Sequence, residues 1–122
     1  AIVVDDVAFA RKVIKDILIS AKYAIVAEGT NGEEAVRAYN QFKPDFIILD
    51  AVMPKRGGIE ATRSILDGHK EARILMVSGM AHEALLMEAI NAGVRDYLLK
   101  PFSPDDLLRA VEKILKEDED IA

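Results

Sequence analysis

The stretch FIILD at residues 46–50 is a short apolar run that ends in a carboxylate, and it sets the pattern for the whole chain. Other apolar runs end in a polar residue in the same way, at residues 2–4, 24–27, 74–77 and 97–99. These runs are continuous rather than alternating, which is typical of strands buried on both faces of a parallel sheet.

After each run comes a stretch with apolar residues at helical spacing. Asn31 is placed to cap the second of these helices with Glu34 reaching back to it, and Ser103 to begin the last. Gly93 is placed to end the fourth in a left-handed conformation. Because strand–helix–strand crossovers are right-handed and both faces of a sheet must be covered, the pattern predicts an α/β fold, a doubly wound (βα)5 sandwich with a parallel five-stranded sheet.

Length and composition restrict the class of protein further. The 122 residues predict a single domain over 1–122, with no output domain after it. The absence of cysteine excludes disulfides and thiol nucleophiles, and a net charge of −5 without tryptophan argues against direct binding of nucleic acid. Since no apolar run approaches the roughly 18 residues of a membrane span and no signal peptide is recognisable, we expect a cytoplasmic protein without membrane insertion.

The polar residues at the strand ends indicate the chemistry. The first run is followed by Asp5 and Asp6, the third by Asp50, the fourth by Ser78 and the fifth by Lys100. Parallel strands end at the same edge of a sheet, so these side chains should converge in one cleft. Three clustered carboxylates repel one another, and a hard divalent cation such as Mg²⁺ relieves that repulsion. The set predicts phosphoryl transfer to a carboxylate nucleophile, giving an aspartyl phosphate.

Over nearly its whole length the chain resembles the receiver domains of two-component response regulators, and among them the free-standing regulators of chemotaxis. The matching motifs are Val3-Val4-Asp5-Asp6, Leu49-Asp50 with Met53-Pro54 and Gly58, Ser78, and Lys100-Pro101-Phe102. The resemblance implies a flavodoxin-like fold with strand order 2-1-3-4-5, helices on both faces, and a cis peptide bond before Pro101.

The same resemblance implies a role for each residue of the site. Asp50 is expected to be the phosphoacceptor, and Lys100 to pair first with Asp50 and then with the phosphoryl oxygens. Mg²⁺, for which Mn²⁺ could substitute, is expected on Asp6, Asp50 and the backbone carbonyl of Val52, while Asp5 acts mostly through a bound water. Ser78 should swing toward the phosphoryl group, and Tyr97 should change rotamer with it.

The implied function is a phosphorylation-dependent switch, which is not an enzyme beyond assisting its own phosphorylation and dephosphorylation. A histidine kinase would be the phosphodonor. A separate output protein, such as a flagellar motor switch, would dock on the face formed by the fourth helix, fifth strand and fifth helix. Val52 and Met80, two positions after Asp50 and Ser78, are apolar, and we expect them to slow hydrolysis by excluding water.

Other functions remain open at this stage. A sporulation-type phosphorelay intermediate would use the same site. A phosphohydrolase of the haloacid dehalogenase type would need a second acid two residues after Asp50, where Val52 stands. A flavodoxin-like redox carrier would need a hydroxyl-rich phosphate loop where Asp5 and Asp6 stand, and a phosphorylation-independent binding module would retain only the scaffold.

Overall fold

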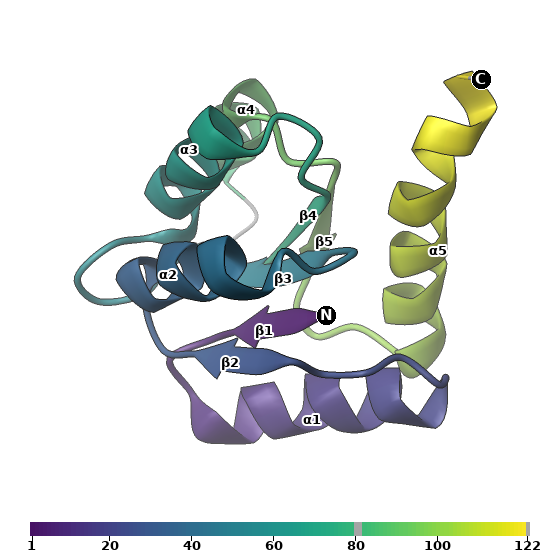
Figure 1. Cartoon of the computed structure of the whole chain (residues 1–122). Helices are drawn as coiled ribbons and strands as arrows, with labels where there is room; N and C mark the ends of the chain where they lie inside the picture. The colour runs from purple at the N-terminus through teal and green to yellow at the C-terminus, as the bar shows by residue number, and fades with distance from the viewer. Residues whose placement is uncertain (80–81, 122) are drawn as a thin grey trace.

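Strands and helices alternate along the chain (Figure 1). The computed structural model describes residues 1–79 and 82–121, and the side chains among them up to residue 116. The elements in these residues are β1 (Ile2–Val4), α1 (Ala8–Ser20), β2 (Ala27–Gly29), α2 (Gly32–Phe42), β3 (Ile47–Asp50), α3 (Gly58–Gly68), β4 (Ile74–Ser78), α4 (Glu83–Ala92), β5 (Asp96–Leu99) and α5 (Pro104–Ile121).

The strands form one parallel sheet in the order β2-β1-β3-β4-β5. One face packs on α1 and α5 through a cluster that includes Ile14, Leu18 and Val111, and the other packs on α2 and α3 through a cluster that includes Tyr39 and Ile65. Figure 1 shows α1 and α5 apart from the group of α2, α3 and α4. The predicted flavodoxin-like doubly wound sandwich is therefore confirmed.

The sheet is buried only at its centre. Every residue of β1, β3 and β4 is buried, as the continuous apolar runs predict. The edge strands differ: Glu28 on β2 is exposed, and β5 has no fully buried residue. The predicted second strand at 24–27 is wrong by three residues at its start, because β2 begins at Ala27. An edge strand is covered less completely than a central one, so its apolar residues do not fix its position.

The helix ends follow the predicted capping with one correction. Asn31 Oδ1 accepts a hydrogen bond from Glu34 N at 2.9 Å, but the Glu34 carboxylate bonds to Thr30 N at 2.6 Å rather than to the cap residue itself. Gly93 ends α4 with a φ of 110°, and the Lys100–Pro101 peptide bond is cis, both as expected. None of the helices in the described part of the chain combines the length and apolar character that crossing a bilayer requires.

Gly58 allows α3 to begin against the end of β3. A Cβ atom at this position would lie 2.3 Å from the carbonyl oxygen of Asp50. We therefore expect Gly58→Ala to lower the free energy of unfolding by about 1–3 kcal/mol, because two backbone segments would have to separate. Chemical denaturation measures the change.

Gly68, at the other end of the same helix, is the matched control, since an added Cβ would meet nothing within 4 Å. Gly68→Ala should be neutral or slightly stabilising. Equal losses of stability in the two variants would show that close packing at Gly58 is not the cause.

Candidate functional site

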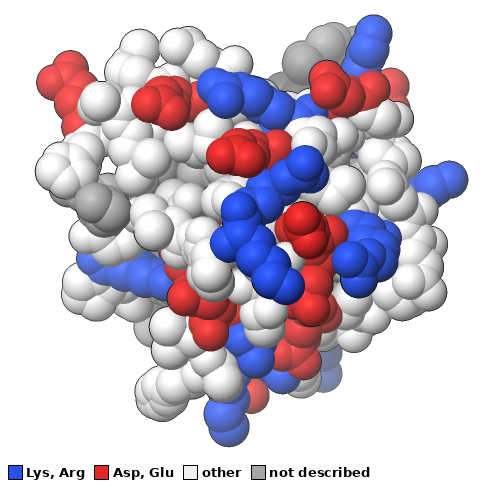
Figure 2. All heavy atoms as spheres, turned by 90° about the vertical axis from the view of Figure 1, so that its left-hand side faces the viewer, with Lys and Arg blue, Asp and Glu red and all other residues white. Residues whose placement is uncertain are grey.

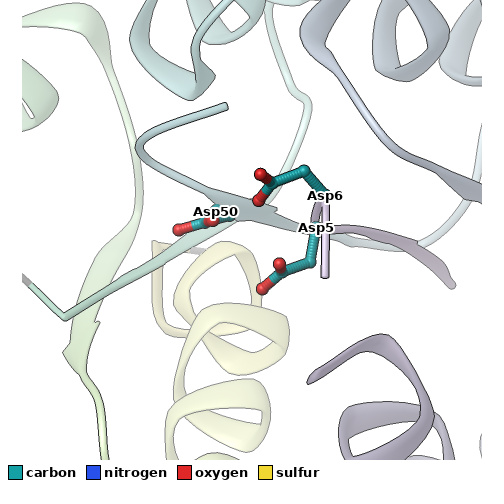
Figure 3. A group of neighbouring side chains, drawn as sticks. All are labelled: Asp5, Asp6 and Asp50. Carbon is teal, nitrogen blue, oxygen red and sulfur yellow. The ribbon is translucent and has the colours of Figure 1, made fainter. Parts of the chain in front are cut away.

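Three carboxylates meet beyond the ends of two neighbouring strands. Asp5 and Asp6 follow β1, and Asp50 is the last residue of β3. One oxygen atom from each lies within 4.8 Å of the other two, and Figure 3 shows the three side chains as neighbours at the strand ends. Asp5 is fully buried and Asp50 is 7% exposed, whereas Asp6 is open to solvent. The sequence correctly predicted that these acids come together.

The face that carries these acids has charges of both signs. Figure 2 views the molecule from the side toward which β1 and β2 run in Figure 1, and acidic and basic side chains are intermixed across it. A cluster of carboxylates in such a setting is partly neutralised by nearby lysine and arginine side chains. The contacts of the individual side chains show which cations contribute.

Asp5 is the most firmly held member of the cluster. Its Oδ1 accepts a hydrogen bond from Val7 N at 2.9 Å, and its Oδ2 accepts one from Lys100 Nζ at 2.7 Å. Its backbone N donates to Gly29 O at 3.1 Å, which fastens the end of β1 to β2. Because both side-chain oxygens accept hydrogen bonds, the Asp5 side chain is held in a fixed orientation.

Lys100 lies nearer to Asp5 than to the expected partner Asp50. Its Nζ is 2.7 Å from Asp5 Oδ2 and 3.8 Å from Asp50 Oδ1. Lys100 therefore contacts Asp50, as expected, and it also makes a shorter contact with Asp5, the carboxylate that is fully buried. The backbone N of Lys100 donates a hydrogen bond to Ser78 O at 2.8 Å. The ends of β4 and β5 therefore position the Lys100 side chain.

Burial and the neighbouring charges shift the pKa of Asp50. Burial, followed by the charge of Asp5, raises the pKa of Asp50 to about 6, while Lys100 lowers it and Asp6 raises it further. An ionised Asp50 is therefore costly in this site unless more positive charge arrives. The three carboxylates offer only oxygen atoms as metal ligands, and one of them, Asp6, is exposed to solvent. This set fits Mg²⁺, which prefers oxygen ligands and keeps several of its waters.

The remaining predicted site residues lie on or next to the same edge. Ser78 is buried at the end of β4, where its neighbour Val77 is in register with Asp50. Tyr97 is partly buried on β5 and packs against a cluster that includes Met76 and Ala89. Val52, two positions after Asp50, is 54% exposed. The expectation for Met80 lies outside the described residues.

One residue of the site was not singled out from the sequence. Arg11 on α1 donates a hydrogen bond from Nη1 to the carbonyl oxygen of Asp5 at 2.7 Å. The sequence does contain a sign of this role, because Arg11 lies three residues before Ile14 and seven before Leu18, on the buried face of the helix. A cation in an apolar stripe requires a polar partner inside the protein.

The raised pKa of Asp50 predicts a pH-dependent stability when no divalent cation is bound. Asp50 binds its proton more tightly in the folded protein, at a pKa of about 6, than at the ordinary value of 3.8, so its contribution to stability is lost as pH rises through this range. In chelator at pH 7, Asp50→Asn should be more stable than the parent by on the order of 1–3 kcal/mol.

Urea denaturation at pH 4 and pH 7 measures this difference. Asp67→Asn, which removes an exposed carboxylate from α3, should not reproduce it. A gain in Asp50→Asn that is equally large at both pH values would show that titration of Asp50 is not the cause.

A family model described as the response regulator receiver domain matches residues 1–112. The chain is 41% identical over 115 residues to chemotaxis protein CheY of Thermotoga maritima, which covers 94% of this chain and 96% of that protein. It is also 41% identical over 114 residues to chemotaxis protein CheY of Bacillus subtilis, at 93% and 95% coverage.

Solved structures agree. The CheX–CheY–BeF3–Mg²⁺ complex from Borrelia burgdorferi is similar at a TM-score of 0.89 and 31% identity, over 93% of this chain and 86% of that one. A CheY-like receiver domain protein from Methanospirillum hungatei has a TM-score of 0.91 over 99% and 96% of the two chains, and at 24% identity it supports the fold alone.

Proposed function

The chain belongs to the response regulator receiver family, and we propose that it is a CheY-like switch that accepts a phosphoryl group on Asp50 and then changes its affinity for a separate output protein. Membership implies a histidine kinase as phosphodonor and a signalling role rather than classical enzyme activity. The observation that carries the proposal is the meeting of three carboxylates, the Lys100 ammonium and Ser78 at one edge of the sheet.

In the proposed reaction the Asp50 carboxylate is the nucleophile. A new bond joins one of its oxygens to phosphorus, and the bond from phosphorus to the imidazole nitrogen of the donor breaks. Lys100, at 3.8 Å from Asp50, favours the ionised carboxylate and is near enough to follow the negative charge onto the phosphoryl oxygens. The Ser78 hydroxyl, on the adjacent strand end, would donate a hydrogen bond to one of those oxygens, with Tyr97 changing rotamer.

Asp6, Asp50 and the backbone carbonyl of Val52 would hold Mg²⁺ directly, and Mn²⁺ could take its place. Asp5 would act through a water, because its two oxygens already accept hydrogen bonds from Val7 and Lys100. When bound, the cation would supply positive charge to the acid cluster and the incoming phosphoryl group. We also propose that the site assists its own dephosphorylation, slowly, since apolar Val52 stands where a polar side chain could orient water.

We expect acetyl phosphate with Mg²⁺ to add one phosphate to the parent protein, because a small phosphodonor needs only the nucleophile and the charges that surround it. Intact-mass spectrometry measures the addition. Asp50→Ala should stay unmodified, whereas Asp67→Asn, on the exposed side of α3, should be modified like the parent. Modification of Asp50→Ala to the same extent would place the phosphoacceptor elsewhere.

The output partner would dock on the face of α4, β5 and α5. Apolar side chains are exposed there without a covering element: Leu86, Met87 and Ile90 on α4 are 36%, 49% and 52% exposed, and Leu99 on β5 is 46% exposed. Exposed apolar residues on neighbouring elements are typical of protein interaction sites. The two CheY relatives reported above are chemotaxis proteins matched over almost their full length. We therefore propose one receiver domain in these 122 residues, a cytoplasmic location and the flagellar motor switch as output.

Beryllofluoride with Mg²⁺, a mimic of the phosphoryl group, should perturb amide signals from Ser78 to Leu108 more than those of α2 in nitrogen-15 NMR spectra. The reason is that bound phosphate favours one of two conformations through new contacts to Ser78 and Lys100. Asp50→Ala should show neither set of changes. Shifts of equal size in both regions would argue against this face as the output surface.

A further inference from the structure

Arg11 is a cation inside the protein with two oxygen partners. Its side chain is only 17% exposed, Nη1 donates to the Asp5 carbonyl oxygen at 2.7 Å, and Nε donates to Glu28 Oε1 at 3.2 Å. The guanidinium therefore links α1 to the end of β1 and to the edge strand β2. It contacts the backbone of the acid cluster rather than its carboxylates.

Glu28 fixes the guanidinium from the far side. Its second oxygen, Oε2, accepts a hydrogen bond from Lys15 Nζ at 2.8 Å, and the two cations, Lys15 most strongly, lower the pKa of Glu28. Glu28 is itself held in the sheet, in register with Val3. A planar guanidinium holds its donors on separate nitrogens in fixed directions, here Nη1 and Nε, whereas a lysine ammonium offers a single nitrogen on a flexible stem.

The carbonyl that Arg11 binds belongs to the peptide group between Asp5 and Asp6. A peptide group is planar, so holding its oxygen also fixes the plane that contains the N and Cα atoms of Asp6, from which the Asp6 side chain starts. Asp5 is fixed by its own hydrogen bonds, whereas Asp6 is exposed. Arg11 is therefore placed to restrain the backbone that carries the outermost carboxylate of the cluster.

We propose that Arg11 is a positioning residue for the cation site: it holds the Asp5–Asp6 peptide group so that the Asp6 carboxylate faces Asp50. This inference rests on the proposed function, in which Asp6 and Asp50 share Mg²⁺. Second-layer groups that orient metal ligands contribute to affinity without touching the metal. The same reasoning predicts that the shape of the side chain matters at this position, beyond its charge.

Lys15 provides a matched control for charge. It stands one helical turn after Arg11 on α1, is 26% exposed and binds the same glutamate, but its described contact is with Glu28 and not with Asp5. Arg11→Met and Lys15→Met each remove one positive charge and one partner of Glu28. Only Arg11→Met also releases the carbonyl of Asp5.

Titration calorimetry with MgCl2 alone, on the full chain without phosphodonor, tests the proposal. Arg11→Met should bind Mg²⁺ about tenfold more weakly than the parent, the lower end of the effect of such second-layer groups. Lys15→Met should stay within about twofold of the parent, because the described contact of Lys15 is with the solvent-exposed Glu28, and interactions between exposed charges are screened by salt. Unfolding curves in chelator show separately how each variant changes the stability of the fold.

Arg11→Lys is the second variant, and it tests the proposal in the event that Arg11→Met does not fold. It retains the charge but lacks the separate Nη1 and Nε donors that contact Asp5 and Glu28, so it should also bind Mg²⁺ more weakly than Lys15→Met. If the parent binds Mg²⁺ and the folded Arg11 variants match Lys15→Met, this inference is overturned and the proposed function stands. If the parent binds no Mg²⁺, both are overturned.

Discussion

Repulsion among the carboxylates of Asp5, Asp6 and Asp50 is the constraint on which the site depends. The sheet order places β1 beside β3, so the acids at their ends are brought together despite the electrostatic repulsion between them. Burial, and after it the charge of Asp5, raises the pKa of Asp50 to about 6, so the cost of ionising Asp50 is not fully offset. Lys100 offsets part of the negative charge of the cluster, and the charge that is not offset favours the binding of a cation.

Positions at the strand ends were predictable because topology decides them. Continuous apolar runs identified the buried strands β1, β3 and β4, and the ends of parallel strands must share an edge, so Asp50 and Ser78 were placed correctly. The position of β2 was not predictable in this way, since its outer edge pairs with no other strand in the described sheet and Val26 before it is 44% exposed.

Contacts between side chains were predicted less well than positions. Lys100 lies beside Asp50 as expected, at 3.8 Å, but its shorter bond of 2.7 Å to the fully buried Asp5 was not anticipated. Arg11 was missed because its partner is a backbone carbonyl, and every residue has one, so the sequence does not mark this carbonyl as a binding partner. The position of Arg11 on the apolar face of α1 was the available signal.

The difference in exposure between Asp5 and Asp6 has a consequence for loading of the site. The inner acid is sealed within the protein, whereas the outer acid faces bulk water. A cation can therefore arrive and depart on the outer side while the inner framework stays closed, with no opening of the fold. We expect occupancy to follow the free concentration of the ion in the surroundings, so the switch would be ready whenever the surroundings supply that ion.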